Sequence, residues 1–410
     1  MKTLRDYQVD LSIQGAEKLK QLGIVYYAIE VRVGKTAIAM QTCMLLEAKK
    51  VLFLTKKKAI KSIENDYKDF GFDKHFDLTV INNESLHKIT DNDFDVVIGD
   101  EFHRVGGSFP KPSKMAKDFK SRFFKTPLIL LSGTPHPESY SQIYHQFWVS
   151  KFNPFKETNF YKWAKEYCRV YQVNYGYGSV NAYDRADEHK IMNVINKYFI
   201  TYTQKESGFE TVVKEHFLKV KMNKSTYQLA DRLMKDKVIE SKSGVILADT
   251  AVKLQGKIHQ IYSGTIKFEE GNAIAFDLSK AEYIKEYFRN KKIGIFYKFV
   301  AELDALKKVF KDDLTTDLEE FNNSDKNIAL QIVSGREGIS LRNADCLVYY
   351  NIDFSAVSYF QSKDRMSTID RLENNIYWVF SEGGIEEKIY KAVSKKKNYT
   401  NSVFRRQYKL

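Results

Sequence analysis

Four short apolar runs, each ending in polar residues, constrain the fold of the first part of this chain more than any other feature. The runs are rich in Val, Ile and Leu, and helical patterns separate them; they are VLFLT (51–55), LTVIN (78–82), FDVVIGDE (94–101) and PLILLSGTP (127–135). Such runs are typical of strands buried on both faces of a parallel sheet. Because ligands of these sheets bind beyond the carboxyl ends of the strands, the polar residues there are the candidates for chemistry.

The same alternation of apolar runs and helical patterns returns from about residue 275, with KIGIFY, IALQIV, CLVYYN and IYWVFS as the strand-like runs. Between these two regions such runs are sparse and aromatic residues are dense, and VYQVNYGYGSVNAY (170–183) has the pattern of a β-hairpin around a glycine-rich turn. We therefore expect an α/β protein in three parts. The expected parts are a first α/β domain at 1–150, a helical insert with a hairpin at 151–274, and a second α/β domain with a basic tail at 275–410.

The formal net charge of the 410 residues is +13. This excess favours a polyanionic partner such as nucleic acid, although basic charge also occurs as a solubility feature. Cys43, Cys168 and Cys346 are scattered and form neither a metal-ligand pattern nor a disulfide framework, as in a reducing cytosol. The start is too polar for a signal peptide, and no apolar run approaches the roughly 20 residues that span a bilayer. We expect a cytoplasmic protein without membrane contact.

Gly34-Lys35-Thr36 is a candidate phosphate-binding loop. It follows the strand-like run GIVYYAIE and precedes the helical pattern AIAMQTCMLLEA. A helix N-terminus offers unpaired N–H groups and a positive dipole end to phosphate. In such a loop Lys35 would reach the β- and γ-phosphates and the Thr36 hydroxyl would bind Mg²⁺. The full fingerprint has another glycine where Ile29 stands, so these three residues alone also fit a chance match.

Asp100 and Glu101 end another strand-like run. Two adjacent carboxylates there suit Mg²⁺ binding by one and orientation of an attacking water by the other. Taken alone, the pair also fits an ordinary acidic strand-to-loop boundary. In the same way, Ser132-Gly133-Thr134-Pro135 after the next run also fits an ordinary turn.

Read in order, these motifs resemble those of superfamily-two helicases and translocases, most of all the Snf-type branch. LRDYQ (4–8) resembles the adenine-recognition motif, EVRVGKT the family's EMGLGKT phosphate loop, GDEFH the DExH box and LLSGTP the coupling motif. VLFLTKKKAI and VINNESLHK (80–88) resemble the segments that touch nucleic acid. VSGREGISL (333–341) and NIDFSAVSYFQSKDRMSTIDR (351–371) resemble the glycine-rich and the closing glutamine-arginine motifs. The small size resembles phage-encoded DEAD/DEAH-like DNA helicases.

The resemblance implies an α/β fold with two RecA-like parallel-sheet motor domains and a helical, aromatic-rich insert between them. It implies ATP and Mg²⁺ as cofactors and forked, branched or duplex DNA as partner. The implied protein is a monomer that hydrolyses ATP to move on DNA and to unwind or remodel it in replication or recombination, in the host cytoplasm if phage-encoded. The alternatives are a duplex-DNA translocase that does not separate strands, and an ATP-gated nucleic-acid-binding clamp.

The resemblance also implies roles for individual residues. Those expected to catalyse hydrolysis are Lys35, Asp100, Glu101, Arg365 and Arg371. Those expected to bind the nucleotide are Arg5, Gln8, Val33, Gly34, Lys35, Thr36, His103, Gly338, Gln361 and Arg365, and Thr36 and Asp100 are expected to hold Mg²⁺. Those expected to bind nucleic acid are Thr55, Lys56, Lys57, Lys58, Asn83, Ser334, Arg336, Tyr175 and Tyr177. The three lysines also fit a solvated loop, and the two tyrosines also fit an ordinary surface.

The chain departs from the family pattern at two places. Arg32 stands where the family has the first glycine of its phosphate loop, and a glycine there permits a positive φ. After Gln361, Arg365 is followed by Thr368 where the family has a second arginine, and Arg371 comes three residues later. Either arginine, or both, can supply the finger to the γ-phosphate.

Overall fold

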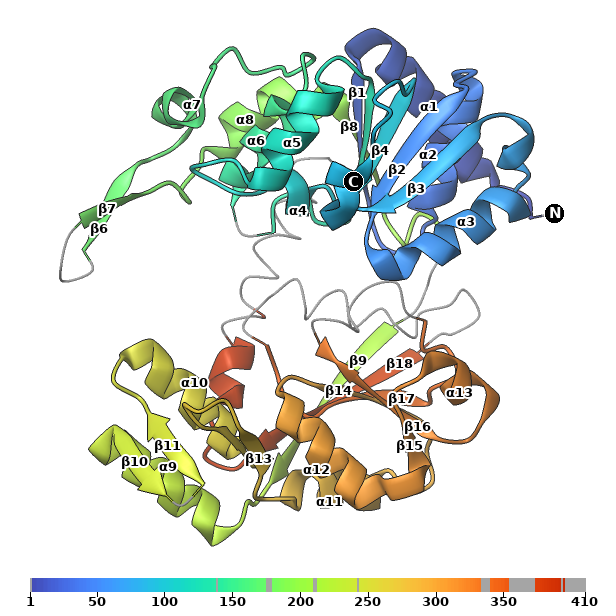
Figure 1. Cartoon of the computed structure of the whole chain (residues 1–410). Coiled ribbons are helices and arrows are strands. Elements are labelled where there is room, and N and C mark those ends of the chain that lie inside the picture. The colour runs from blue at the N-terminus through green and yellow to red at the C-terminus, as the bar shows by residue number, and fades with distance from the viewer. Residues whose placement is uncertain are drawn as a thin grey trace. The chain divides into compact units, whose positions relative to one another are not determined.

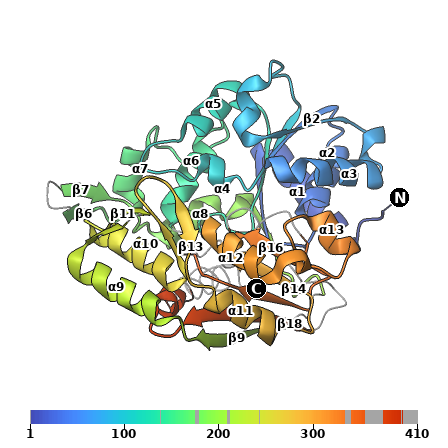
Figure 2. The same ribbon diagram turned by 60° about the horizontal axis from the view of Figure 1, so that its bottom comes forward.

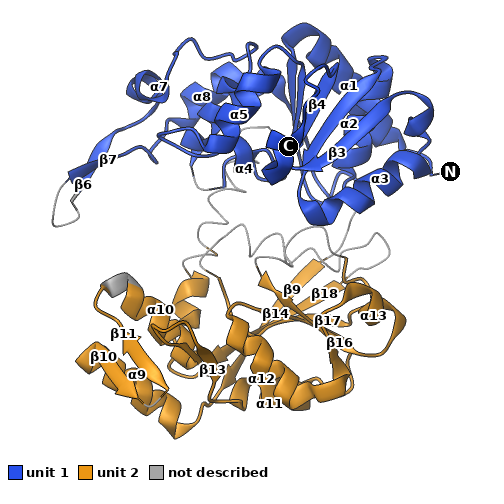
Figure 3. Ribbon diagram, in the orientation of Figure 1, with its two compact units in different colours: residues 1–208 blue, residues 209–410 orange. Residues whose placement is uncertain are grey.

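The computed structural model describes residues 2–137, 139–174, 179–208, 212–241, 243–332, 340–353 and 373–391, together with residue 394. The chain divides into two units, residues 1–208 and 209–410, and each contains one six-stranded sheet (Figures 1 and 3). Every strand pair in both six-stranded sheets is parallel. The prediction of two parallel-sheet α/β domains is therefore confirmed.

The sheet of the first unit has the strand order β3-β2-β4-β5-β1-β8. Helices α1, α2 and α3 pack on one face, and α4, α5 and α6 lie on the other (Figure 1). The helices of this unit are α1 (Asp6–Leu22), α2 (Lys35–Leu45), α3 (Ile60–Asp69), α4 (His103–Gly106), α5 (Lys114–Phe123), α6 (Ile143–Trp148), α7 (Phe160–Tyr167) and α8 (Glu188–Ile195). The 3-10 turns are η1 (Lys57–Ala59), η2 (Phe72–Lys74), η3 (Asn83–Lys88), η4 (Tyr140–Gln142) and η5 (Asn196–Tyr198). The strands are β1 (Ile24–Ile29), β2 (Lys50–Thr55), β3 (Asp77–Asn82), β4 (Val96–Asp100), β5 (Leu128–Leu131), β6 (Tyr171–Asn174), β7 (Ser179–Ala182) and β8 (Phe199–Tyr202).

The four apolar runs of the first part form β2, β3, β4 and β5, as predicted. The inner strands β1, β4 and β5 are almost wholly buried because helices cover both of their faces. Since all strands run the same way, the segments after β1, β2, β3, β4 and β5 emerge at one carboxyl edge of the sheet. That edge carries most of the candidate site residues.

The sheet of the second unit has the order β15-β16-β14-β17-β18-β9. Its strands are β9 (Val212–Val220), β14 (Ile293–Tyr297), β15 (Leu314–Thr315), β16 (Asn327–Gln331), β17 (Cys346–Tyr349) and β18 (Glu373–Ser381), and two hairpins add β10 (Val238–Ser241), β11 (Gly244–Leu247), β12 (Thr265–Lys267) and β13 (Ala273–Ala275). Its helices are α9 (Lys224–Asp236), α10 (Ala251–Tyr262), α11 (Ser279–Tyr287), α12 (Val300–Phe310) and α13 (Leu318–Asn323), with the 3-10 turn η6 (Lys311–Asp313). Helices α9 and α10 pack side by side with the β10–β11 hairpin around a small core of their own (Figures 1 and 2).

The boundary between the units falls at residues 208 and 209, inside the segment 151–274 that we expected to form an insert. The reason lies in strand pairing: β8 pairs with β1 in the first sheet, and β9 pairs with β18 in the second. The expected hairpin is present as β6 and β7, which pair antiparallel and extend away from the body of the first unit (Figure 1). Within the described residues, no helix combines the length and the apolar character needed to cross a membrane.

Candidate functional site

The candidate phosphate loop joins β1 to α2 and is fixed by the start of α1. Its Val33 carbonyl accepts hydrogen bonds from the Tyr7 hydroxyl and from Gln8 Nε2, both at 3.0 Å. Gly34 has φ 95° and caps α2, so the loop turns through a conformation that suits glycine. The helix that follows opens with Lys35, and its first N–H groups point at the loop as a phosphate site requires.

Gln8 uses both ends of its side-chain amide within the protein. Its Oε1 accepts from the Arg5 backbone N–H at 3.0 Å while its Nε2 holds Val33. The Arg5 guanidinium donates to the Tyr7 hydroxyl at 3.3 Å, and the Tyr7 ring stacks on Tyr202 with centroids 5.0 Å apart. The LRDYQ motif therefore both caps α1 and positions the phosphate loop.

The segment after β8 holds the other side of the loop. Gln204 Nε2 donates to the Val31 carbonyl at 3.0 Å, and the Gln204 backbone N–H donates to the Glu30 carboxylate at 2.8 Å. The Glu30 N–H in turn donates to the Tyr202 carbonyl at 3.0 Å. Sequence reasoning missed Tyr7, Tyr202 and Gln204. Tyr7 lies within a recognised motif, but no pattern in the sequence indicates that β8 pairs beside β1.

The Lys35 side chain is bonded to the backbone of the phosphate loop. Its ammonium donates to the carbonyls of Ile29 at 2.9 Å and Glu30 at 3.2 Å. When a nucleotide binds, the ammonium can leave these carbonyls and turn toward the phosphate oxygens. The left-handed glycine, the helix N-terminus and this lysine together fit the triphosphate of ATP.

Asp100 ends β4 beside the buried hydroxyl of Thr55, which donates to Asp100 Oδ2 at 2.8 Å. Burial, and then the neighbouring Glu101 carboxylate, raise the pKa of Asp100, while Thr55 and the charges of Lys35 and Lys56 act in the opposite direction. A half-buried carboxylate beside a hydroxyl is the kind of oxygen ligand that Mg²⁺ takes, so Asp100 fits the ion. Thr55, expected among the nucleic-acid contacts, has its hydroxyl turned to this carboxylate.

Glu101, His103 and Ser132 form one hydrogen-bonded cluster. The Ser132 hydroxyl donates to Glu101 Oε2 at 3.2 Å and lies 2.9 Å from His103 Nδ1, which is itself 3.3 Å from Glu101 Oε2. The Thr134 N–H donates to the Ser132 hydroxyl at 3.0 Å. The DExH-like segment after β4 is thereby joined to the SGTP segment after β5. Glu101 has φ 46°, an uncommon conformation for glutamate that is typical of functional sites.

The described candidate nucleic-acid residues of the first unit lie at the same edge. Lys56, Lys57 and Lys58 follow β2 directly, and η1 begins at Lys57. Asn83 begins η3 after β3 but is only 6% exposed, and its Oδ1 has no hydrogen-bond partner among the described residues. Asn83 is therefore too buried to contact a nucleic acid as the structure stands.

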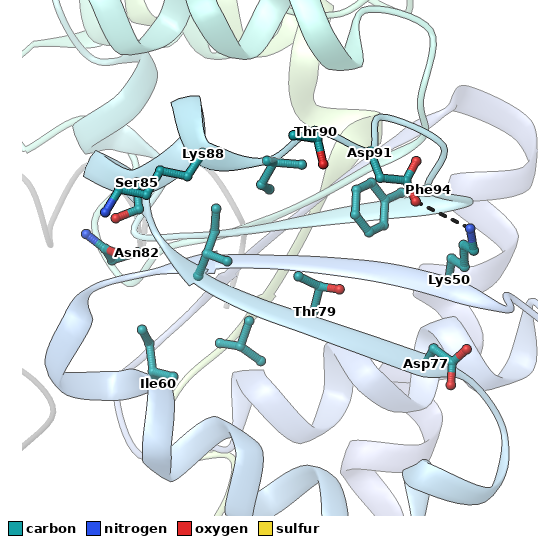
Figure 4. Close-up of a pocket in the computed structure, with 13 residues that line it drawn as sticks. Lys50, Ile60, Asp77, Thr79, Asn82, Ser85, Lys88, Thr90, Asp91 and Phe94 are labelled. Atoms are coloured by element: carbon teal, nitrogen blue, oxygen red, sulfur yellow. Dashed lines mark hydrogen bonds and ion pairs between the residues drawn. The ribbon is translucent and has the colours of Figure 1, made fainter.

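A cavity of about 630 Å³ lies beside β3 (Figure 4). Asn82, Ser85 and Lys88 line one part of it, and the ion pair between Lys50 and Asp91, at 3.4 Å, lies at another. No residue of the phosphate loop lines this cavity. It is therefore separate from the candidate nucleotide site.

Several candidate residues lie outside the described part of the chain. They are Tyr175 and Tyr177 of the hairpin turn, Ser334, Arg336 and Gly338 of the glycine-rich motif, and Gln361, Arg365 and Arg371 of the closing motif. The first unit thus supplies the described half of the candidate site.

No family model matches the chain. In sequence it is similar to Helicase SWR1 of Candida glabrata, at 27% identity over 190 residues that cover 40% of this chain and 13% of that protein. It is also similar to Helicase ssl-1 of Caenorhabditis elegans, at 26% identity over 182 residues that cover 39% of this chain and 8% of that protein. The chain spans only these small fractions of both relatives. Both relatives are named as helicases, which agrees with the resemblance to helicases.

Among solved structures, the chain is similar to a Sulfolobus solfataricus SWI2/SNF2 ATPase core in complex with dsDNA. The TM-score is 0.44 at 15% identity, and the match covers 98% of this chain and 93% of that one.

Replacing Arg32 with glycine is expected to stabilise the protein. Arg32 has φ 65°, a left-handed conformation that costs a residue with a Cβ about 1–2 kcal/mol. After allowance for the greater unfolded-state freedom of glycine, the gain is about 1 kcal/mol, or roughly 2–4 °C in melting temperature. Lys237→Gly is the control, since Lys237 has φ 63° at the end of α9. Both variants should melt later; a lower melting temperature for Arg32→Gly would mean that its side-chain contacts outweigh the strain.

Replacing Gln204 with alanine is expected to weaken ATP binding about 3–10-fold, because a hydrogen bond worth about 0.5–1.5 kcal/mol no longer holds Val31. The affinity should be measured with a fluorescent nucleotide. Lys205→Ala removes an exposed neighbour on the same turn and should bind ATP normally. If the two variants bind ATP with equal affinity, Gln204 does not contribute to the nucleotide site.

Proposed function

We propose that this chain is a DNA-dependent ATPase that uses ATP hydrolysis to move along DNA. One observation carries the proposal. The phosphate loop, which α1 positions, and the carboxylates at the end of β4 lie at the same edge of the sheet. The Lys35 ammonium donates to a carbonyl of that loop, and its positive charge acts to lower the pKa of Asp100. The sequence similarity to proteins named as helicases supports the same activity.

Five described residues of the first unit have a part in the proposed reaction. Lys35 and the N–H groups at the start of α2 bind the β- and γ-phosphates, and Thr36 and Asp100 hold Mg²⁺. The ion neutralises charge that develops on the transferring phosphoryl group. Glu101 orients the attacking water, and Ser132 keeps its carboxylate in place through their hydrogen bond.

The resemblance also assigns an arginine finger to Arg365, Arg371 or both. Arginines placed in this way stabilise the charge of the phosphoryl-transfer transition state.

We further propose duplex or branched DNA as the track, with strand separation or remodelling at forks as the work performed. The basic charge of the chain supports a nucleic-acid partner. The deciding experiment compares ATPase rates with single-stranded, duplex, forked and four-way DNA and with RNA, alongside unwinding of a labelled fork. Stimulation by DNA supports the proposal, and a rate that no nucleic acid changes would overturn it. Stimulation by duplex DNA without fork unwinding would identify a translocase that leaves the strands paired.

A further inference from the structure

The segment between β4 and β5 is strongly basic. After Glu101, from Phe102 to Pro127, the sequence contains one acidic residue, Asp118. Its basic residues are Arg104, Lys111, Lys114, Lys117, Lys120, Arg122 and Lys125. Asp118 pairs with Arg122 on the same helix, at 3.1 Å between the guanidinium Nε and Oδ1. The remaining positive charges of the segment therefore have no acidic counterpart within it.

Three of these lysines, Lys111, Lys114 and Lys117, form what we call the α5 lysine row. All three are exposed, and none makes an ion pair within the described part of the chain. The row differs from its neighbours, since Lys120 lies 3.6 Å from the centre of the Trp148 ring. It differs also from many surface lysines elsewhere, which pair with a carboxylate; these include Lys2, Lys50, Lys190, Lys253 and Lys326.

The start of α5 is fixed at the carboxyl edge of the sheet. The Ser113 hydroxyl accepts from the Ala116 N–H at 2.9 Å, which caps α5, and donates to the Val105 carbonyl of α4 at 2.8 Å. Because α4 directly follows β4, this contact keeps Lys111 and Lys114 near the carboxyl end of that strand. Arg122 also donates to the Ile89 carbonyl just after η3, at 2.7 Å, so α5 packs beside the segment that follows β3.

Two basic segments therefore follow two neighbouring strands. Lys56, Lys57 and Lys58 follow β2, and the α5 lysine row comes after β4. The sheet order β3-β2-β4 makes β2 and β4 adjacent. The three exposed lysines of the row repel each other unless a polyanion binds them, and a nucleic-acid backbone is the polyanion with regularly repeated charges.

We propose that the α5 lysine row binds phosphates of duplex DNA and extends the contact made by the loop after β2. Lys114 and Lys117 are three residues apart on α5, about 4.5 Å along the axis, and flexible lysine stems can adjust to the phosphates of a strand. Duplex DNA carries about one charge per 1.7 Å of axis, about twice that of one strand. That density offers phosphates to the row and to the loop after β2 at the same time. This inference rests on the proposed DNA-dependent function.

The test is the salt dependence of binding to a labelled duplex by the full chain. Lys111→Ala, Lys114→Ala and Lys117→Ala together should lower the slope of log affinity against log salt by about two to three units. The matched control replaces Lys20, Lys49 and Lys125, which are exposed in the same unit but lie at the opposite, amino edge of the sheet. That control removes the same charge and should keep most of the slope. Melting temperatures should show that both variants fold.

Each outcome bears on the proposal. Arginine in place of the three lysines should restore the slope, because charge rather than lysine shape makes the contact. An unchanged slope in the row variant, or an equal fall in both alanine variants, would overturn the assignment. A fall with single-stranded DNA or RNA but not with duplex would overturn the choice of partner. Wild-type chain that binds no nucleic acid would instead overturn the proposed function itself.

Discussion

Replacing Glu101 with glutamine is expected to leave ATP binding close to wild type and to slow hydrolysis about 10²–10³-fold. Glutamine keeps the shape of the side chain and an oxygen that can accept from Ser132, so the local cluster should persist. It cannot act as a base toward the attacking water, and general-base contributions of about 10²–10⁴ are typical. The measurements are nucleotide affinity and steady-state phosphate release with saturating DNA.

Lys35→Ala is the matched comparison, because it should fail at the earlier step. It removes the cation that lies across the phosphate loop, so nucleotide affinity itself should fall. The two variants therefore separate binding from turnover. Near-normal turnover by Glu101→Gln would place the water-orienting group elsewhere in the chain.

The interior strands could be predicted from sequence because two-sided burial leaves a continuous apolar run. β4 and β5 are such strands, and each was identifiable from its Val, Ile and Leu residues alone. β9 was missed for the opposite reason. It is an edge strand whose residues alternate between exposed and partly buried along VVKEHFLKV, so its sequence is as polar as a loop. The two units meet between residues 208 and 209 because β8 pairs in the first sheet and β9 in the second.

The residues of the candidate site also divide into those that the sequence predicts and those that it does not. Lys35 and Glu101 follow strands directly, and adjacent residues with distinctive chemistry are visible in a sequence. Tyr202 and Gln204 act on the loop from about 170 residues away, and only the pairing of β8 with β1 brings them there. Arg32 is the intermediate case: the sequence marks it as a departure from a glycine, and the structure gives it the left-handed φ that glycine would adopt.

Replacing Gly34 with alanine is expected to weaken ATP binding at least 30-fold. Gly34 has φ 95°, and a Cβ built there would lie 2.1 Å from Gln8 Nε2. The left-handed backbone costs alanine about 1–2 kcal/mol. Moving Gln8 aside also breaks its bond to Val33, worth about 1 kcal/mol. Together about 2–3 kcal/mol must be supplied to restore the loop that binds phosphate, and each 1.4 kcal/mol is a factor of about ten in affinity.

Two further variants separate these contributions. Gly208→Ala places a Cβ on a residue with φ 85° that has no atom within 4 Å of that Cβ, so it carries backbone strain without a collision. It should lower the melting temperature slightly and leave ATP affinity unchanged. Gly34→Ala combined with Gln8→Ala keeps the backbone strain and the lost bond, so its affinity should match that of Gly34→Ala alone. If Gly34→Ala alone binds ATP as tightly as wild type, the contact between α1 and the phosphate loop does not position the nucleotide.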